Sequence, residues 1–327
     1  MSPISPGQYA ARLVAATRRD VMVALKRATS GMDTERPGSA RRGVMAWLDE
    51  HDTEDHFLRY VANESRTDAS RLLNAADQHA AAMQHLLHDG VAFGALATLE
   101  RALLESVLTL CYVHDHEASP DRLMLRMIAR TLDTFEGSHR AHRQFTRTFT
   151  AAKRRSGEES VAGVRDLFRA HGVDIEPEKR GGTPHIGLLG TRENVKFDAT
   201  AAAQRYFGTD AHHWTTSSGA THSKAWYLIS VSPDSGERGG QAGTRVMGAA
   251  TVGSLTASRA LLRAIEGFTG FSTRPEQEGI FRREKGLISQ LNGGAPLEPV
   301  SLAEHEARGP TWRPRAPRLD SFQARNA

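Results

Sequence analysis

Residues 91–113 read VAFGALATLERALLESVLTLCYV, the most apolar long stretch of this 327-residue chain. The leucine, valine and phenylalanine residues recur at helical spacing, but they spread around most of the helix instead of following one stripe. A helix that is apolar on most of its sides is normally enclosed by other helices. We therefore expect residues 91–113 to form the central helix of a bundle.

The rest of the chain predicts further helices around this one. Apolar residues recur with a period close to 3.6, and no alternating series of strands occurs. The expected fold class is therefore all-α, a helical bundle. The expected helices cover residues 9–30, 55–88 with a break near 63, 121–149, 161–171, 198–207, 211–231, 247–268 and 275–291.

Glycine and proline mark the expected connections. Residues 173–195 hold two prolines and four glycines, which predicts a long Gly/Pro-rich internal loop with one short extended piece at 186–189. From residue 292 onward, five prolines and little apolar periodicity predict a disordered C-terminal tail, 292–327. We expect a single helical domain over 1–291, with a possible sub-boundary in the long loop. Further loops are expected at 31–43, 153–157 and 233–243.

Composition excludes some classes of protein. The single cysteine, Cys111, rules out a disulfide framework, and no apolar stretch is long enough for a membrane span. The N-terminus lacks the charged and then apolar order of a signal peptide, so we expect a cytoplasmic protein. Lys and Arg number 42, of which 36 are Arg, against 38 Asp and Glu. Because acidic residues are interspersed, this excess does not by itself predict a nucleic-acid-binding face.

Charged residues interrupt the central helix and suggest a buried polar site. Glu105 lies on this helix, and Arg126 and Arg130 lie four residues apart on the next one. An antiparallel hairpin of the two helices would bring one of these arginines level with Glu105. His222, on the helix expected at 211–231, could add an acid or base to the set. The alternatives are a buried ion pair that fixes the hairpin register, or a solvated face with an ordinary core histidine.

One part of the chain resembles known proteins. The run Leu99-Glu-Arg-Ala-Leu-Leu-Glu105, the spaced arginines after it, and Ser-Gly-Ala-Thr-His222 near a tryptophan are similar to a loose group of actinobacterial all-helical proteins. Those proteins resemble the wider HEPN-like families. The resemblance covers residues 70–230. It implies a helical fold and, as for many members of those families, a toxin or defence role.

HEPN-type ribonucleases carry an Arg, a polar residue and, a few residues later, a His on one helix. Arg165-Asp-Leu-Phe-Arg-Ala-His171 has that form. The resemblance implies metal-independent RNA cleavage, in which His171 handles the proton of the 2′-hydroxyl and Arg165 stabilises the developing phosphate charge. The alternative is a charged, solvated helix end, where His171 interacts favourably with the helix dipole.

A metal site is a further hypothesis. Glu136-Gly-Ser-His139 and Asp210-Ala-His-His213 have the spacing of ligand pairs that bind two iron or manganese ions in helical bundles. The alternative is that these spacings arise by chance, since the chain has 15 histidines.

Three functions stay open. They are an HEPN-like ribonuclease or defence protein that acts on RNA and needs no cofactor, a non-catalytic binding or regulatory module, and a dimetal oxygenase-like biosynthetic enzyme. The bundle could also form a homodimer.

Overall fold

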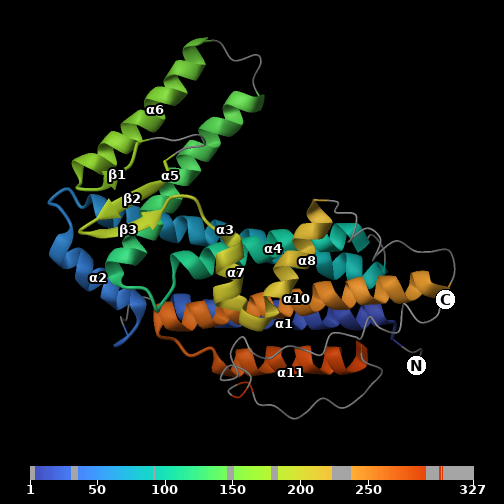
Figure 1. The fold of residues 1–327 in the computed structure, drawn as a ribbon. Coiled ribbons are helices and arrows are strands. Elements are labelled where there is room, and N and C mark those ends of the chain that lie inside the picture. Colours follow the sequence, from blue (N-terminus) through green and yellow to red (C-terminus); the bar gives the residue numbers. More distant parts are fainter. Residues whose placement is uncertain are drawn as a thin grey trace, which may run out of the picture.

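The structure, a computed structural model, describes residues 4–30, 36–90, 93–145, 151–177, 183–222 and 237–291, together with 302 and 304. Helices make up most of it, which confirms the all-α bundle (Figure 1). They are α1 (Pro6–Ser30), α2 (Ala40–His51), α3 (Phe57–Asp89), α4 (Phe93–Val113), α5 (Pro120–Phe145), α6 (Ala151–Ala170), α7 (Ala199–Phe207), the 3₁₀ helix η1 (Gly208–Ala211), α8 (His212–Thr221), α10 (Glu237–Thr269) and α11 (Arg274–Leu291).

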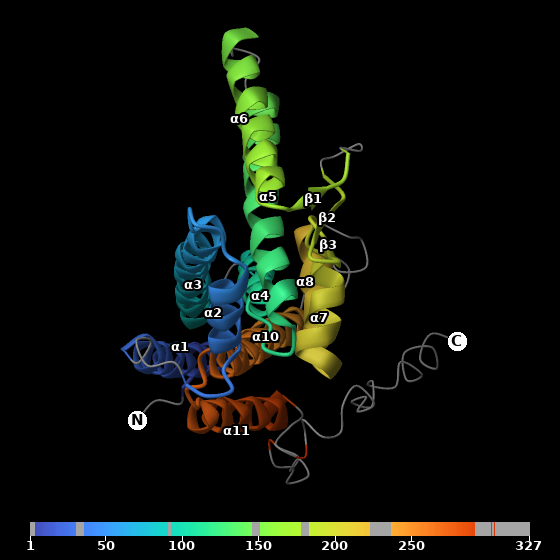
Figure 2. The same cartoon turned by 90° about the vertical axis from the view of Figure 1, so that its left-hand side faces the viewer.

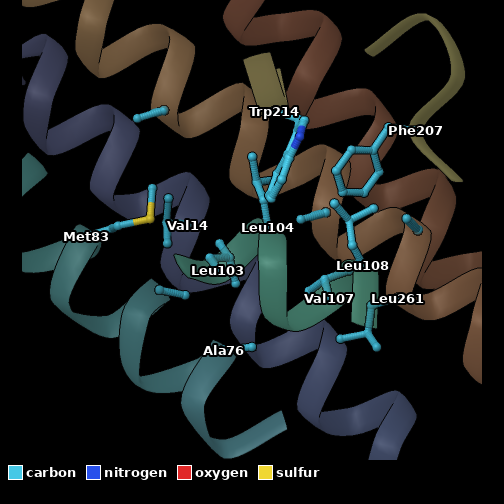
Figure 3. Packing of buried hydrophobic residues seen from close by; sticks show 14 of the residues in the cluster. Val14, Ala76, Met83, Leu103, Leu104, Val107, Leu108, Phe207, Trp214 and Leu261 are labelled. Atoms are coloured by element: carbon cyan, nitrogen blue, oxygen red, sulfur yellow. The ribbon is translucent and has the colours of Figure 1, made fainter. Parts of the chain in front are cut away.

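Helix α4 is the centre of the bundle, as its sequence predicts. It packs against α3, α10, α8 and α7. Leu104 and Leu108 are fully buried, and Figure 3 shows them between Trp214 of α8 and Leu261 of α10. This first core also takes in Val14 of α1 and Met83 of α3. Surrounding helices on several sides explain why α4 is apolar on most of its faces.

A second core lies under α2, α5, α6 and the start of α3. Phe57 and Leu58, at the start of α3, belong to this second core, whereas Met83 and Leu87, near the end of α3, belong to the first. The predicted break near Asn63 is wrong, because α3 runs unbroken from Phe57 to Asp89. No glycine or proline lies within that range, so the backbone meets no local reason to stop.

The predicted loop over 173–195 contains a small antiparallel sheet. The strands are β1 (Asp174–Ile175), β2 (His185–Leu188) and β3 (Thr191–Asn194), in the order β1-β2-β3. Ile186 and Leu188 of β2 are buried in the second core. The extended piece expected at 186–189 is therefore confirmed over 186–188, whereas residue 189 lies in the turn, and β1 and β3 were not predicted. Strands of two to four residues are too short to show an alternating pattern.

Helices α5 and α6 form an arm that projects away from the rest of the molecule in two perpendicular views (Figures 1 and 2). The break predicted at 153–157 is wrong, because α6 begins at Ala151. This segment has no apolar periodicity, yet lysine and arginine are good helix formers. The first half of α5, which carries Arg126 and Arg130, does not project. It packs on the body of the protein through contacts with Asp115 and Asp68 and through the second core.

The C-terminal third differs from expectation in two places. Helix α8 ends at Thr221, and the last part of the helix expected at 211–231, residues 223–231, lies outside the described residues, as do residues 232–236. Helix α10 begins at Glu237, so the loop predicted at 233–243 is wrong from that residue on. The tail at 292–327 lies outside the described residues apart from Leu302 and Glu304. Among the helices that are described, none combines the length and the apolar character needed to cross a membrane.

Candidate functional site

Arg165, the first residue of the predicted nuclease pair, binds a buried carboxylate. Its Nη2 lies 2.6 Å and its Nε 3.1 Å from Oε1 of Glu136 on α5. Thr183 donates to the same carboxylate from its hydroxyl, at 2.6 Å, and from its backbone N–H, at 3.0 Å. Burial alone would raise the pKa of Glu136, but the bonds from Thr183 and Arg165 outweigh it and lower this pKa. Glu136 thus joins α5, α6 and the segment before β2.

His171, the second residue of that pair, binds a different carboxylate. It follows the end of α6 and stacks on Phe57 with 4.0 Å between ring centroids. Its Nε2 lies 2.7 Å from Oδ2 of Asp55, and its Nδ1 lies 2.8 Å from the carbonyl of Leu167. Desolvation would lower the pKa of His171, but the bond to Asp55 outweighs it and raises this pKa. Both ring nitrogens are therefore engaged within the protein, and the carboxylate that His171 binds, Asp55, is not the one that Arg165 binds, Glu136.

Glu105 and Arg126 do not meet, in contrast to the predicted pairing. Glu105 is exposed on α4, while Arg126 is buried on α5. Arg130, the other predicted partner, lies 3.0 Å from Asp68 of α3. The reason is that α5 does not fold back along α4 but leaves it at a steep angle (Figure 2). His222 lies exposed just beyond the end of α8.

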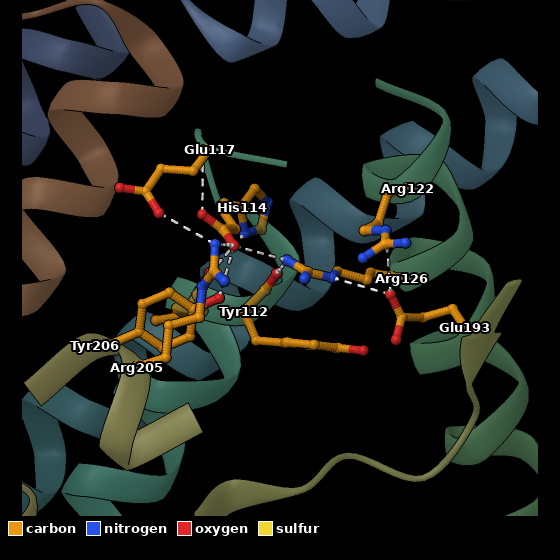
Figure 4. A network of polar contacts seen from close by, with 10 residues as sticks. Tyr112, His114, Glu117, Arg122, Arg126, Glu193, Arg205 and Tyr206 are labelled. Atoms are coloured by element: carbon orange, nitrogen blue, oxygen red, sulfur yellow. Dashed lines mark hydrogen bonds and ion pairs between the residues drawn. The ribbon is translucent and has the colours of Figure 1, made fainter. Parts of the chain in front are cut away.

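Arg126 instead belongs to a polar network around Asp115, in the turn between α4 and α5 (Figure 4). Arg126 Nη1 donates to Asp115 at 3.0 Å and to the carbonyl of Tyr112 at 2.9 Å. The Tyr206 hydroxyl donates to Asp115 at 3.0 Å, and Arg205 Nη2 lies 2.9 Å away. Burial would raise the pKa of Asp115, but these bonds, led by that of Arg126, lower it. The carboxylate is thus ionised and surrounded by donors.

This network connects parts of the chain that are distant in sequence. Arg126 also approaches Glu193 of β3, with 3.4 Å between Nε and Oε2. Tyr206 and Arg205 come from α7, so Asp115 and Arg126 hold α5, α7 and the sheet together (Figure 4). Burial is the main cause that raises the pKa of Tyr206, which keeps its hydroxyl protonated as a donor. The arrangement supports a structural junction.

A second polar pair lies in the first core and was not predicted as a pair. Glu100 of α4 and His213 of α8 are both buried, with 3.7 Å between Oε1 and Nδ1. Burial raises the pKa of Glu100 well above its usual value and lowers that of His213 to about 3. Oε1 of Glu100 has no hydrogen-bond partner among the described residues. A Cβ on Gly253 of α10 would overlap the Glu100 carboxyl, so α10 lies directly against it.

The proposed metal ligands are distributed over different contacts. Glu136 binds Arg165 and Thr183, as above, and Asp210 lies 3.0 Å from Arg259 of α10. Within the described part of the chain, no three His, Cys, Asp or Glu side chains come together as a group that could hold a metal ion.

One short segment carries a density of positive charge that the net charge of the whole chain does not reveal. Between Glu136 and Glu158 the chain carries five Arg, one Lys and two His, and no Asp or Glu. This segment forms the outer part of the α5–α6 arm, with residues 146–150 outside the described residues. A net charge taken over short windows of sequence would have found it, because the chain is otherwise mixed in charge.

Comparisons with protein-family models, with curated proteins and with solved structures find no match to this chain. The HEPN-like resemblance therefore stays a prediction.

Proposed function

We propose that this protein is a helical binding module that engages single-stranded RNA through the outer part of its α5–α6 arm. The observation that carries the proposal is the concentration of positive charge there. Residues 137–157 have a formal charge of +6, whereas the whole chain has +4, so all other residues together sum to −2. The arm projects from the body, which gives an extended polyanion access to it (Figures 1 and 2).

A phosphate backbone is the ligand that suits such a segment. Lys and Arg that neutralise phosphates release condensed counterions, and this release supplies most of the sequence-independent affinity for nucleic acid. The remainder of the protein is slightly acidic and would repel RNA at long range. Binding is therefore expected to be oriented, with the arm toward the RNA and the bundle away from it.

Aromatic residues interleaved with the arginines favour a single strand over a duplex. Phe145 and Phe149 lie within the basic segment, and Phe135 lies one residue before Glu136. Phe135 is 47% exposed, so part of its ring is open to a ligand. Unpaired bases stack on exposed aromatic rings, whereas bases inside a duplex are not available for this. The HEPN-like resemblance implies RNA as well.

Binding is proposed ahead of cleavage because of the contacts that Arg165 and His171 make. The guanidinium of Arg165 is occupied by Glu136, and both nitrogens of His171 are occupied by Asp55 and Leu167. A general base needs a ring nitrogen within reach of the proton it takes. These contacts support positioning roles for the two residues. Measuring RNA cleavage in EDTA beside binding tests the catalytic alternative.

The test is fluorescence anisotropy with a labelled single-stranded RNA of about 20 nucleotides, at several salt concentrations. The arm variant replaces Arg143, Lys153, Arg154 and Arg155 with Gln. The matched control replaces four exposed cations outside the arm with Gln. These are Arg19, Arg71, Lys196 and Arg282.

We expect the wild type to bind with a slope of log K against log salt near −4, since about six phosphate contacts contribute roughly −0.7 each on a single strand. The arm variant should lose about three units of that slope, and the control should lose little. Equal losses in both variants, or no binding by the folded wild type, would overturn the proposal. Tighter binding to a duplex than to the single strand would overturn the single-strand assignment.

A further inference from the structure

A groove between α1 and the C-terminal end of α3 has the chemistry of an anion-binding site. Its volume is about 390 Å³, within the range of small-molecule sites. No Asp or Glu is among the residues that line it. They are Gln8, Ala11, Arg12 and Ala15 from α1, and Gln84, His85 and His88 from α3.

The groove depends on a close approach of the two helices. Gly7, in the first turn of α1, lies against the backbone carbonyl of Leu87 in the last turn of α3. A Cβ at position 7 would overlap that carbonyl, so only glycine permits this spacing. Beside this contact, Arg12 of α1 and His85 and His88 of α3 line the same groove.

The polar groups that remain available in this groove are mostly hydrogen-bond donors. The side-chain oxygen of Gln8 accepts from the Ser5 N–H at 3.2 Å, and that of Gln84 accepts from Arg18 at 3.1 Å. Each glutamine therefore keeps its NH₂ group for a ligand. Arg12 makes no hydrogen bond or ion pair with any residue that the structure describes, so its five N–H donors are available.

We propose that this groove binds a phosphate group, carried either by a small metabolite or by the end of a nucleic acid. A guanidinium group can donate two hydrogen bonds to two phosphate oxygens, and the glutamine NH₂ groups and the imidazoles can donate to the remaining oxygens. His88 keeps its Nε2 for this purpose, because its Nδ1 lies 3.3 Å from Asp89. The site is built from α1 and α3 and shares no residue with the basic arm, so it does not rest on the function proposed above.

The experiment is isothermal titration of the full-length protein with inorganic pyrophosphate and with AMP. Arg12→Ala removes the guanidinium, and Arg19→Ala, on the same helix but outside the groove, is the matched control. Both arginines are exposed, so both variants should fold, which a thermal melt checks. We expect saturable binding by the wild type, a loss of about tenfold or more in Arg12→Ala, and a change below about twofold in Arg19→Ala.

A second comparison identifies the source of the phosphate. A 5′-phosphorylated RNA dinucleotide is titrated beside its 5′-hydroxyl counterpart. An advantage of the phosphorylated form that disappears in Arg12→Ala, without binding of AMP, indicates a nucleic-acid end, whereas binding of AMP indicates a metabolite. The proposal is overturned if no probe saturates the wild type below about 10 mM, or if both arginine variants lose equally.

Discussion

Glu100 and His213 face each other inside the first core, with 3.7 Å between Oε1 and Nδ1 and with 5% and 7% of their side chains exposed. Burial raises the pKa of Glu100 and lowers that of His213 to about 3, so it favours the uncharged form of each group. The pair therefore avoids the cost of a buried ion, which is several kcal/mol per group.

The first prediction concerns the pH dependence of stability in Glu100→Gln. The unfolded chain ionises this carboxyl near its ordinary pKa of 4.5, but burial in the folded protein keeps it protonated to a higher pH. Its contribution is therefore fully present below pH 4.5 and is lost as pH rises toward the folded pKa. Gln, which cannot ionise, should stabilise the protein relative to wild type increasingly as pH rises above 4.5. Thermal melts at several pH values measure the difference, and Glu105→Gln, at an exposed carboxyl on the same helix, is the control variant.

The second prediction is that two Gly→Ala substitutions in helices have opposite signs. Gly253→Ala forces a Cβ into the Glu100 carboxyl and should destabilise the protein by about 1–3 kcal/mol. Gly163 of α6 has nothing within 4 Å of the position that its Cβ would take. Gly163→Ala should therefore stabilise by about 0.5–1 kcal/mol through helix propensity. Urea unfolding gives both values, and a stabilising Gly253→Ala would contradict the packing of α10 on Glu100.

The helical fold could be predicted because it depends on local periodicity. The apolar residues of 91–113 predict the central helix directly. Gly90 ends α3 with a left-handed φ of 66°, as expected for a glycine after the last turn of a helix. The start of α6 could not be predicted, since 151–157 has no apolar stripe. The sheet was missed because its strands have two to four residues each.

The polar contacts were harder to predict because they depend on the angle between helices. Glu105 and Arg126 would meet only if α4 and α5 were antiparallel, and sequence spacing carries no information about that angle. The contact between Asp115 and Arg126 spans only eleven residues. It could have been predicted from local sequence, because a residue in the turn before a helix is close to the first turns of that helix. The partnership of Glu100 with His213 joins residues 113 positions apart, and only the packed structure shows it.

The third prediction separates the buried and the exposed arginine at the base of α5. Arg126→Ala leaves Asp115 buried with fewer donors and should cost about 3 kcal/mol of unfolding free energy. Arg122 is 49% exposed, and its distance to Glu193 is 4.0 Å, so Arg122→Ala should change stability by less than about 1 kcal/mol. Chemical denaturation of both variants checks this. Similar costs for the two would show that Asp115 does not need Arg126.

The fourth prediction concerns the titration of His171. Its raised pKa depends on Asp55, so Asp55→Asn should lower the pKa of the imidazole toward or below 6.5. The folded pKa of His171 exceeds its unfolded value, so its contribution to stability is present below pH 6.5 and is lost as pH rises through the folded pKa. NMR titration of the His171 ring protons measures the shift. An unchanged pKa in Asp55→Asn would mean that the contact with Asp55 does not form in solution.

The last prediction distinguishes positioning from catalysis at Arg165. Arg165→Ala removes two hydrogen bonds from the buried carboxylate of Glu136 and should cost up to about 3 kcal/mol of stability. Arg165→Ala combined with Glu136→Gln should recover part of that loss, because the neutral amide no longer needs a cation. A positioning role predicts that RNA affinity recovers together with stability in the double variant. A catalytic role predicts instead that RNA cleavage in EDTA is present in wild type, absent in Arg165→Ala, and still absent in the double variant. Arg169→Ala is the control, since its ion pair with Asp166 is exposed and its loss should leave stability nearly unchanged.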